Sequence, residues 1–400
     1  MPAATPLPRG PSVLALYGAA DLLSAPGCPV CRYVTEASDR YVGWFALEGH
    51  SQPELITTLC ESAGMCARHT RVLMSQPGAA TRLTPVYRYV LTGVRDRLTA
   101  GTLSLAVCPA CTHDVAAAGR ALDTLLDGLA EAGVLRLCQD LGGVCLPHLR
   151  AAAGRGSRRT VADLAQIVQE TLATSTAGSE WLAGTDYDAE VRTCLRREIP
   201  ARSSPVPALC GACLAAAEAE RDSLARATGP GTRDPHRTGG GLGLCAGHLA
   251  ESVVLSSSGQ CRDLLERQFG GLAASRRSTA DRIGLLLARR LRPGAISGRS
   301  GDCPVCHEST AAALRALASA RGAALCIRHQ AVLRSVDRPA SRELGPESVA
   351  VADELIGELA EAFELTTWAG RRDAGPAPPS NAWRRAAAYL NGGVFAGLLA

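Results

Sequence analysis

The tetrapeptide Cys28-Pro-Val-Cys31 is followed, after 34 intervening residues, by Gly64-Met-Cys66-Ala-Arg-His69. The same order, a Cys-x-x-Cys pair and then a Cys-x-x-His pair, recurs three more times along the 400-residue chain. Because an internal repeat identifies the structural unit of a chain, we expect these pairs, which we call half-sites, to organise the fold. The six later half-sites are Cys108/Cys111, Cys145/His148, Cys210/Cys213, Cys245/His248, Cys303/Cys306 and Cys326/His329.

Three thiolates and one imidazole form a ligand set that suits tetrahedral Zn²⁺. Residues i and i+3 in the first turn of a helix lie on one face and can bind one ion together. We join each Cys-x-x-Cys half-site to the Cys-x-x-His half-site that follows it, which predicts four zinc ions. The predicted ligand sets are Cys28, Cys31, Cys66 and His69; Cys108, Cys111, Cys145 and His148; Cys210, Cys213, Cys245 and His248; and Cys303, Cys306, Cys326 and His329.

An iron–sulfur cluster is the alternative cofactor, since three cysteines and one histidine can also hold iron. Cluster motifs usually bunch three cysteines closely, whereas here the half-sites are 19 to 34 residues apart within each repeat. This spacing favours zinc over a cluster.

The segments between half-sites are rich in Ala, Leu, Glu and Arg, which are good helix formers. Apolar residues recur every three or four positions in 115–129 and again in 161–172, which is the periodicity of an amphipathic helix. We therefore predict an all-α protein of four tandem helical repeats, each held by one Cys₃His metal site. Proline- and glycine-rich stretches place the boundaries: an N-terminal segment 1–27, repeats 28–104, 105–200, 201–298 and 299–375, and a linker and C-terminal tail 376–400.

Composition excludes several classes of protein. With 46% hydrophobic and 20% charged residues, the chain is not mainly disordered. A net charge of +4, with 38 acidic residues interspersed among 42 basic ones, provides no basic stripe for nucleic acid. No apolar run approaches the length of a membrane span, and the N-terminal stretch 13–23 contains Asp21, unlike a signal peptide. We expect a cytoplasmic protein with reduced thiols and no membrane or nucleic-acid partner.

Some residues close to the half-sites are expected to support them. A glycine stands two positions before the third cysteine in three repeats, Gly64, Gly143 and Gly243, where the backbone must bend close to the metal. The cysteines outside the half-sites, Cys60, Cys138, Cys194 and Cys261, are expected to be small core residues.

The order Cys-Pro-x-Cys, helical stretch, Gly-x-Cys-x-x-His resembles an uncharacterised bacterial family that carries a domain of unknown function. The pieces that carry the likeness are Cys28-Pro-Val-Cys31, Gly64-Met-Cys-Ala-Arg-His69 and Gly143-Val-Cys-Leu-Pro-His148, and it extends over about 28–370. Repeat 3 departs from it with Gly211 in place of proline, and repeat 4 is short. The resemblance implies metal binding and no activity.

The leading functional hypothesis is a cytoplasmic interaction scaffold, with protein as its partner, because sites with four protein ligands are usually structural. One alternative is a redox protein or enzyme that uses an iron–sulfur cluster or an open zinc site; no catalytic residue or substrate stands out to support it. The other alternative is a metal storage or delivery protein.

Overall fold

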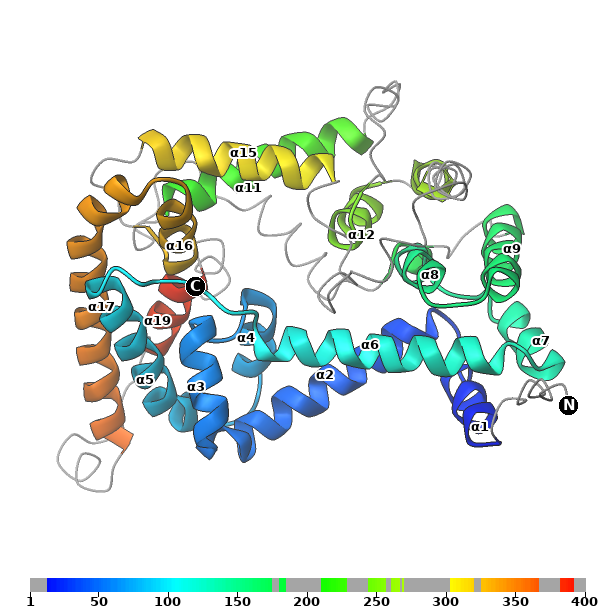
Figure 1. Cartoon of the computed structure of the whole chain (residues 1–400), viewed down its shortest axis with the longest axis horizontal. Helices are drawn as coiled ribbons and strands as arrows, with labels where there is room; N and C mark the ends of the chain where they lie inside the picture. The colour runs from blue at the N-terminus through cyan, green and yellow to red at the C-terminus, as the bar shows by residue number, and fades with distance from the viewer. Residues whose placement is uncertain are drawn as a thin grey trace, which may run out of the picture. The chain divides into compact units, whose positions relative to one another are not determined.

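Figure 1 shows the chain as a computed structural model built of helices. The structure describes residues 13–174, 180–184, 210–228, 244–256, 260–266, 268–269, 303–319, 325–366 and 382–391. None of these residues lies in a strand, so the predicted all-α fold class is confirmed for the described part of the chain.

The chain divides into two compact units, each assembled from three separate stretches of sequence. The first unit comprises Met1–Ala37, Asp114–Asp186 and Asp234–Asp302, and the second comprises Ser38–His113, Tyr187–Arg233 and Cys303–Ala400. Two of the boundaries between them fall inside helices, one in α2 (Pro29–Leu47) and one in α6 (Pro109–Gly128). The boundaries of the four repeats, which were placed from the sequence, remain predictions.

The first unit contains short helices that follow a helical apolar pattern. Val161, Leu164 and Val168 are buried on one face of α9, as their spacing predicts. Residues 260–266 are helical as well. The elements of this unit, α9 among them, are α1 (Val13–Leu22), α7 (Ala132–Asp140), α8 (Leu146–Ala153), α9 (Arg158–Thr174), the 3₁₀ helix η2 (Glu180–Ala183) and α12 (Ala246–Leu255).

The second unit contains the longer helices. Its elements are the 3₁₀ helix η1 (Gly49–Ser51), α3 (Pro53–Ser62), α4 (Ala67–Met74), α5 (Ala79–Thr99), α11 (Gly211–Thr228), α15 (Pro304–Ser319), α16 (Ile327–Val336), α17 (Arg338–Thr366) and α19 (Ala382–Asn391).

The core of the second unit lies between α5 and α17, which are side by side in Figure 1. Leu83, Val90 and Leu91 of α5 are fully buried, and Leu355 and Leu359 of α17 belong to the same apolar cluster. Burying a leucine side chain contributes roughly 1.5–3 kcal/mol each, so this seam is a main source of stability for the unit.

Helices α11 and α15 form an antiparallel pair within the second unit (Figure 1). Arg226, near the end of α11, forms an ion pair with Glu308, near the start of α15. At the opposite end of the pair, Cys210 shares an apolar cluster with Leu317, near the end of α15. The end of α15 therefore lies beside the start of α11.

Among the described helices, none combines the length and the apolar character required to cross a bilayer.

We predict that Leu91→Ala lowers the midpoint of thermal unfolding, followed by circular dichroism, because it opens a cavity in the α5–α17 seam. Such truncations cost about 2–5 kcal/mol. The matched control is Tyr89→Ala on the same helix, since Tyr89 is 65% exposed and its loss should leave the midpoint nearly unchanged. Equal effects of the two substitutions would contradict this placement of the core.

Candidate metal centres

Each described Cys-x-x-Cys half-site is the first turn of a helix. The first cysteine immediately precedes the helix, and its carbonyl oxygen accepts the backbone N–H of the residue four positions later, as from Arg32 to Cys28 at 3.2 Å and from Leu214 to Cys210 at 3.1 Å. Proline occupies the first helical position in three of the four, where its missing N–H costs nothing. The second cysteine then lies on the same face as the first.

The Cys-x-x-His half-sites share one backbone conformation. The cysteine is the N-cap residue in all four, with φ between −66° and −69° and ψ between 158° and 168°. Its side chain makes no capping hydrogen bond with the helix. The histidine follows in the first turn, so its Nδ1 lies 3.1–3.3 Å from the sulfur of its own cysteine. The thiolates lie at the positive end of the helix dipole, which stabilises negative charge.

The glycine before the Cys-x-x-His turn is needed for its backbone angle. Gly64 and Gly143 have φ of 83° and 86°, a region that side chains rarely adopt. A Cβ on Gly143 would also lie 3.0 Å from Ile167 Cγ2. The expectation that glycine lets the chain bend here is confirmed at these two positions, and Gly243 lies outside the described residues.

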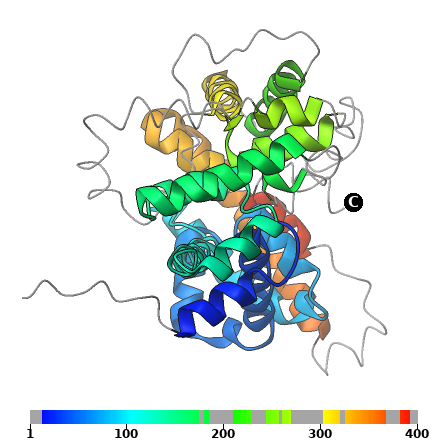
Figure 2. The same ribbon diagram turned by 90° about the vertical axis from the view of Figure 1, so that its right-hand side faces the viewer.

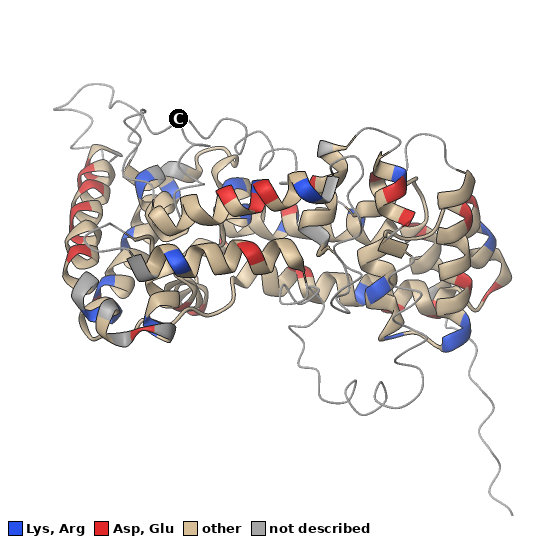
Figure 3. Ribbon diagram, turned by 90° about the horizontal axis from the view of Figure 1, so that it is seen from above, with Lys and Arg blue, Asp and Glu red and all other residues tan. Residues whose placement is uncertain are grey.

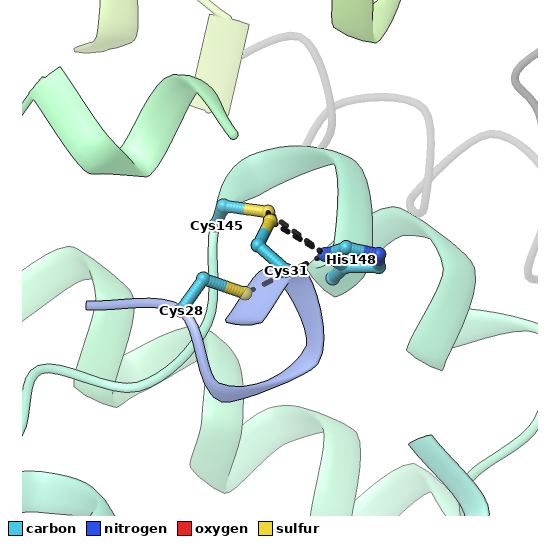
Figure 4. Close-up of side chains that lie close together, drawn as sticks. All are labelled: Cys28, Cys31, Cys145 and His148. Atoms are coloured by element: carbon cyan, nitrogen blue, oxygen red, sulfur yellow. Dashed lines mark hydrogen bonds between the residues drawn. The ribbon is translucent and has the colours of Figure 1, made fainter. Parts of the chain in front are cut away.

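The first unit brings together Cys28, Cys31, Cys145 and His148, which we call group A (Figure 4). His148 Nδ1 lies 3.4 Å from the sulfurs of both Cys28 and Cys31. The sulfurs of Cys31 and Cys145 are 3.6 Å apart. The three cysteines are buried, so the group is screened from water.

The second unit contains two further groups. Group B consists of Cys66, His69, Cys108 and Cys111, and group C consists of Cys210, Cys213, Cys326 and His329. The sulfurs of Cys66 and Cys111 are 3.6 Å apart in group B, and those of Cys213 and Cys326 are 3.7 Å apart in group C. The sulfur–Nδ1 distances range from 3.2 to 3.7 Å.

These distances fit a single tetrahedral ion. Metal–ligand bonds of about 2.3 Å to sulfur and about 2.0 Å to nitrogen place two sulfurs about 3.8 Å apart and sulfur and nitrogen about 3.5 Å apart. The observed separations lie close to both values, and all four ligand atoms of each group lie within 4.8 Å of one another. They are far longer than a disulfide bond of about 2.0 Å, so the cysteines of groups A, B and C are free thiols.

The pairing of half-sites predicted from the sequence is wrong. In groups A, B and C, no Cys-x-x-Cys half-site binds with the Cys-x-x-His half-site of its own repeat. Instead, the pairs are nested: Cys28 groups with His148, 120 positions away, around the inner pair formed by His69 and Cys108. Group C repeats the outer pairing, with Cys210 and His329 separated by 119 positions.

The reason for this pairing is the way in which the helix opened by a Cys-x-x-Cys half-site packs against its neighbour. Helix α15 has 16 residues and therefore spans about 24 Å. Its far end lies beside the start of α11, where Leu317 and Cys210 share a cluster. The next half-site along the chain, Cys326 and His329, consequently meets Cys210 and Cys213. Packing of two antiparallel helices decides which half-sites meet.

Two half-sites remain after groups A, B and C are assigned. Cys245 and His248 belong to the first unit and Cys303 and Cys306 to the second. Each has the local helix-start backbone described above.

In each group, one thiol is strongly acidified by its neighbours. Hydrogen bonds from the surrounding thiols hold its pKa well below the ordinary range, despite burial, which alone would raise it. Burial and the same hydrogen bonds raise the pKa of Cys145, Cys111 and Cys326, so each group combines an acidified thiol with one that stays protonated and whose proton a metal ion must displace. The acidified thiols and their first two hydrogen-bond partners are Cys31 with Cys145 and Cys28, Cys108 with Cys111 and Cys66, and Cys210 with Cys213 and Cys326.

The pKa of the histidine in groups A and C shifts upward. Burial lowers the pKa of His148, but the charge of Cys28 and hydrogen bonds with Cys28 and Cys31 outweigh it and raise the pKa to about 10. The pKa of His329 is likewise lowered by burial and raised to about 10 overall by its hydrogen bonds with the cysteines of group C. Without metal, each imidazole therefore holds a proton, which a metal ion must displace.

One supporting residue was missed at the level of sequence. Gly184 ends η2 with φ of 93°, and a Cβ there would lie 3.6 Å from the sulfur of Cys145. The end of η2 thus lies close to group A, and its positive φ is the reason that glycine is required there. Its signal in the sequence is the segment Trp181-Leu-Ala-Gly184, which is echoed by Trp368-Ala-Gly370 within the fourth repeat; the second segment lies outside the described residues.

The described cysteines that belong to no half-site are ordinary packing residues. Cys138 and Cys261 are buried, and Cys60 packs against the core of the second unit. Burial raises the pKa of all three thiols, to about 12 for Cys138 and about 11 for Cys261. They are therefore neutral thiols, as expected; Cys194 lies outside the described residues.

Replacing two half-sites at once by alanine distinguishes nested from sequential pairing. Removing Cys28/Cys31 together with Cys145/His148 should cost one metal ion per chain, because both belong to group A. Removing Cys28/Cys31 together with Cys66/His69 should cost two, and Cys60→Ser should cost none. Metal content of protein purified with excess metal, measured by mass spectrometry, gives the counts. A loss of two ions in the first variant and one in the second would restore the sequential pairing.

No family model, no curated protein and no solved structure matches this chain significantly. The resemblance to an uncharacterised bacterial family therefore rests on the Cys-Pro-x-Cys and Gly-x-Cys-x-x-His motifs alone. What the chain does has to be argued from the chemistry of its Cys₃His groups, which can hold metal ions.

Proposed function

We propose that this protein is a structural zinc protein, in which Cys₃His zinc sites hold the helices together as a cytoplasmic scaffold that binds other proteins. The observation that carries the proposal is the arrangement of the ligands. Each of groups A, B and C supplies three sulfurs and one nitrogen, mutually spaced for a tetrahedron, from helix starts far apart in the sequence. A metal ion there acts as a cross-link.

The ligand sets favour a structural role over catalysis. Catalytic zinc keeps an open position for water or substrate, whereas sites with four protein ligands are closed. Structural zinc in small peptides contributes about 10–16 kcal/mol of apparent folding free energy. Cross-links of this strength are large compared with the net stability of an ordinary domain.

The spacing also favours a single ion over an iron–sulfur cluster. In a cluster the four protein ligands are divided among two or more iron atoms, so at least some of the ligand atoms lie farther apart than the edges of one tetrahedron. In groups A, B and C all ligand atoms lie within 4.8 Å of one another. Among single ions, Zn²⁺ is the usual occupant of closed Cys₃His sites.

We propose four zinc ions per chain, because the eight half-sites of the sequence together supply twelve cysteines and four histidines. Groups A, B and C use three of those histidines, and Cys245, His248, Cys303 and Cys306 are the candidate ligands that remain. The distance of 3.3 Å between Cys245 sulfur and His248 Nδ1 matches that within the other Cys-x-x-His half-sites.

The charge of the loaded protein supports a protein partner. Twelve thiolate ligands would add twelve negative charges and four Zn²⁺ eight positive ones, so the formal charge of +4 falls to about zero. Acidic and basic residues are mixed along the described helices (Figure 3). A near-neutral chain whose described helices mix acidic and basic residues is poorly suited to nucleic acid.

We predict close to four zinc ions per chain in protein purified from a medium that supplies both zinc and iron. Inductively coupled plasma mass spectrometry measures both metals. Fewer than three zinc ions would contradict the proposal, and iron with brown colour after anaerobic purification would favour the iron–sulfur alternative.

Removal of zinc by a chelator should unfold the helices in step with metal release, because the ions hold distant segments together. Circular dichroism at 222 nm, recorded during the titration, measures this. Zinc that leaves while the helical signal stays constant would support metal storage or delivery instead.

A further inference from the structure

Groups B and C belong to the same unit, and one helix packs against the two helices that begin at their Cys-x-x-His turns. Helix α19 (Ala382–Asn391) packs against α4, α5, α16 and α17 (Figures 1 and 2). α4 begins in the Cys-x-x-His turn of group B, and α16 begins in that of group C. The helix is firmly seated, since five of its side chains are buried in the core: Ala382, Trp383, Ala386, Ala387 and Leu390.

The last residue of α19 is hydrogen-bonded to the Cys-x-x-His turn of group B. Asn391 Nδ2 donates to Thr70 Oγ1 at 3.3 Å, and Thr70 directly follows the ligand His69. Thr70 Oγ1 in turn donates to the carbonyl of Met65 at 3.0 Å, and Met65 directly precedes the ligand Cys66. Asn391 is therefore hydrogen-bonded to Thr70, which follows His69 directly and is itself hydrogen-bonded to the residue that precedes Cys66.

The same asparagine is hydrogen-bonded to group C. Arg328, which directly precedes the ligand His329, donates to Asn391 Oδ1 from Nη2 at 3.1 Å and from Nε at 3.3 Å. Its Nη2 also donates to the carbonyl of Met65 at 3.5 Å. One guanidinium thus reaches from the metal-binding turn of group C to that of group B.

A second connection runs from the other neighbour of His329. Gln330 Nε2 donates to Ser348 Oγ at 2.6 Å, and Tyr389 of α19 donates to the carbonyl of Ser348 at 2.7 Å. Gln330 and Ser348 are both buried, where a broken hydrogen bond is costly. Both residues that flank His329 are therefore linked to α19.

We propose that groups B and C bind their metal ions cooperatively, through the hydrogen-bonded chain Arg328–Asn391–Thr70. The proposal rests on the metal-binding function above. A metal ion at group C fixes the start of α16 and so holds Arg328 in place. Arg328 positions Asn391, which steadies the turn that carries Cys66 and His69. Because coupling between binding sites is reciprocal, metal at group B must strengthen binding at group C by the same factor.

Alkylation of individual cysteines tests the coupling in the zinc-loaded full chain. Cysteines that lose their zinc react with N-ethylmaleimide, and peptide mass spectrometry gives a rate for each one. Replacing Cys210 and Cys213 by alanine removes group C. We expect the reaction of Cys66, Cys108 and Cys111 to become about tenfold faster, within the usual range of coupling between sites. Group A serves as the internal control and should keep its rate.

A variant of Arg328 tests the route of the coupling without touching a ligand. Arg328→Met keeps all ligands and the unbranched apolar stem of the side chain while it removes the guanidinium, so it should still bind four zinc ions. We expect it to raise the alkylation rate of group B, and removal of group C should then add little. The matched control is Arg334→Met on the same helix, since Arg334 has no hydrogen bond to Asn391 among those of the described residues.

The outcomes separate this proposal from the metal-binding function. If the wild-type chain binds fewer than three zinc ions, the proposed function fails. If it binds four but group B keeps its rate without group C, the sites are independent and the coupling is contradicted. If Arg334→Met accelerates group B as much as Arg328→Met does, the hydrogen-bonded chain is not the route.

Discussion

A helix that begins at a metal half-site moves the chain away from that site, and this constraint decides the architecture. Each Cys-x-x-Cys pair is the first turn of a helix of 16 to 20 residues. Such helices span about 24–30 Å. In groups A, B and C, the missing two ligands come from another segment whose own helix also starts at the site. Each of these sites is therefore built from two helix N-termini, whose dipoles favour the thiolates.

The same constraint explains how far the sequence could be interpreted. Residue types and the i, i+3 spacing were enough to single out the cysteines and histidines that the structure gathers into groups A, B and C. The helical periodicity of 115–129 and 161–172 was enough to predict the helices α6 and α9. These features are local, and local backbone physics determines them.

The pairing of half-sites could not be obtained in this way. The 19 residues between Cys306 and Cys326 permit a helix and a return to the starting site, so chain length alone does not exclude sequential pairing. The actual partner is set by tertiary packing: the Arg226–Glu308 ion pair and the cluster that joins Cys210 to Leu317 place the end of α15 beside α11. Gly184 was missed for the same reason, since its contact with Cys145 depends on how η2 folds back over group A.

The central claim is that metal ions connect half-sites in nested pairs, and anomalous diffraction tests it most directly. Crystals of the zinc-loaded chain, measured just above the zinc absorption edge, reveal each ion as a peak in the anomalous difference map. We predict a peak bounded by Cys28, Cys31, Cys145 and His148, a second bounded by Cys66, His69, Cys108 and Cys111, and a third bounded by Cys210, Cys213, Cys326 and His329. A peak bounded by Cys28, Cys31, Cys66 and His69 would contradict the account.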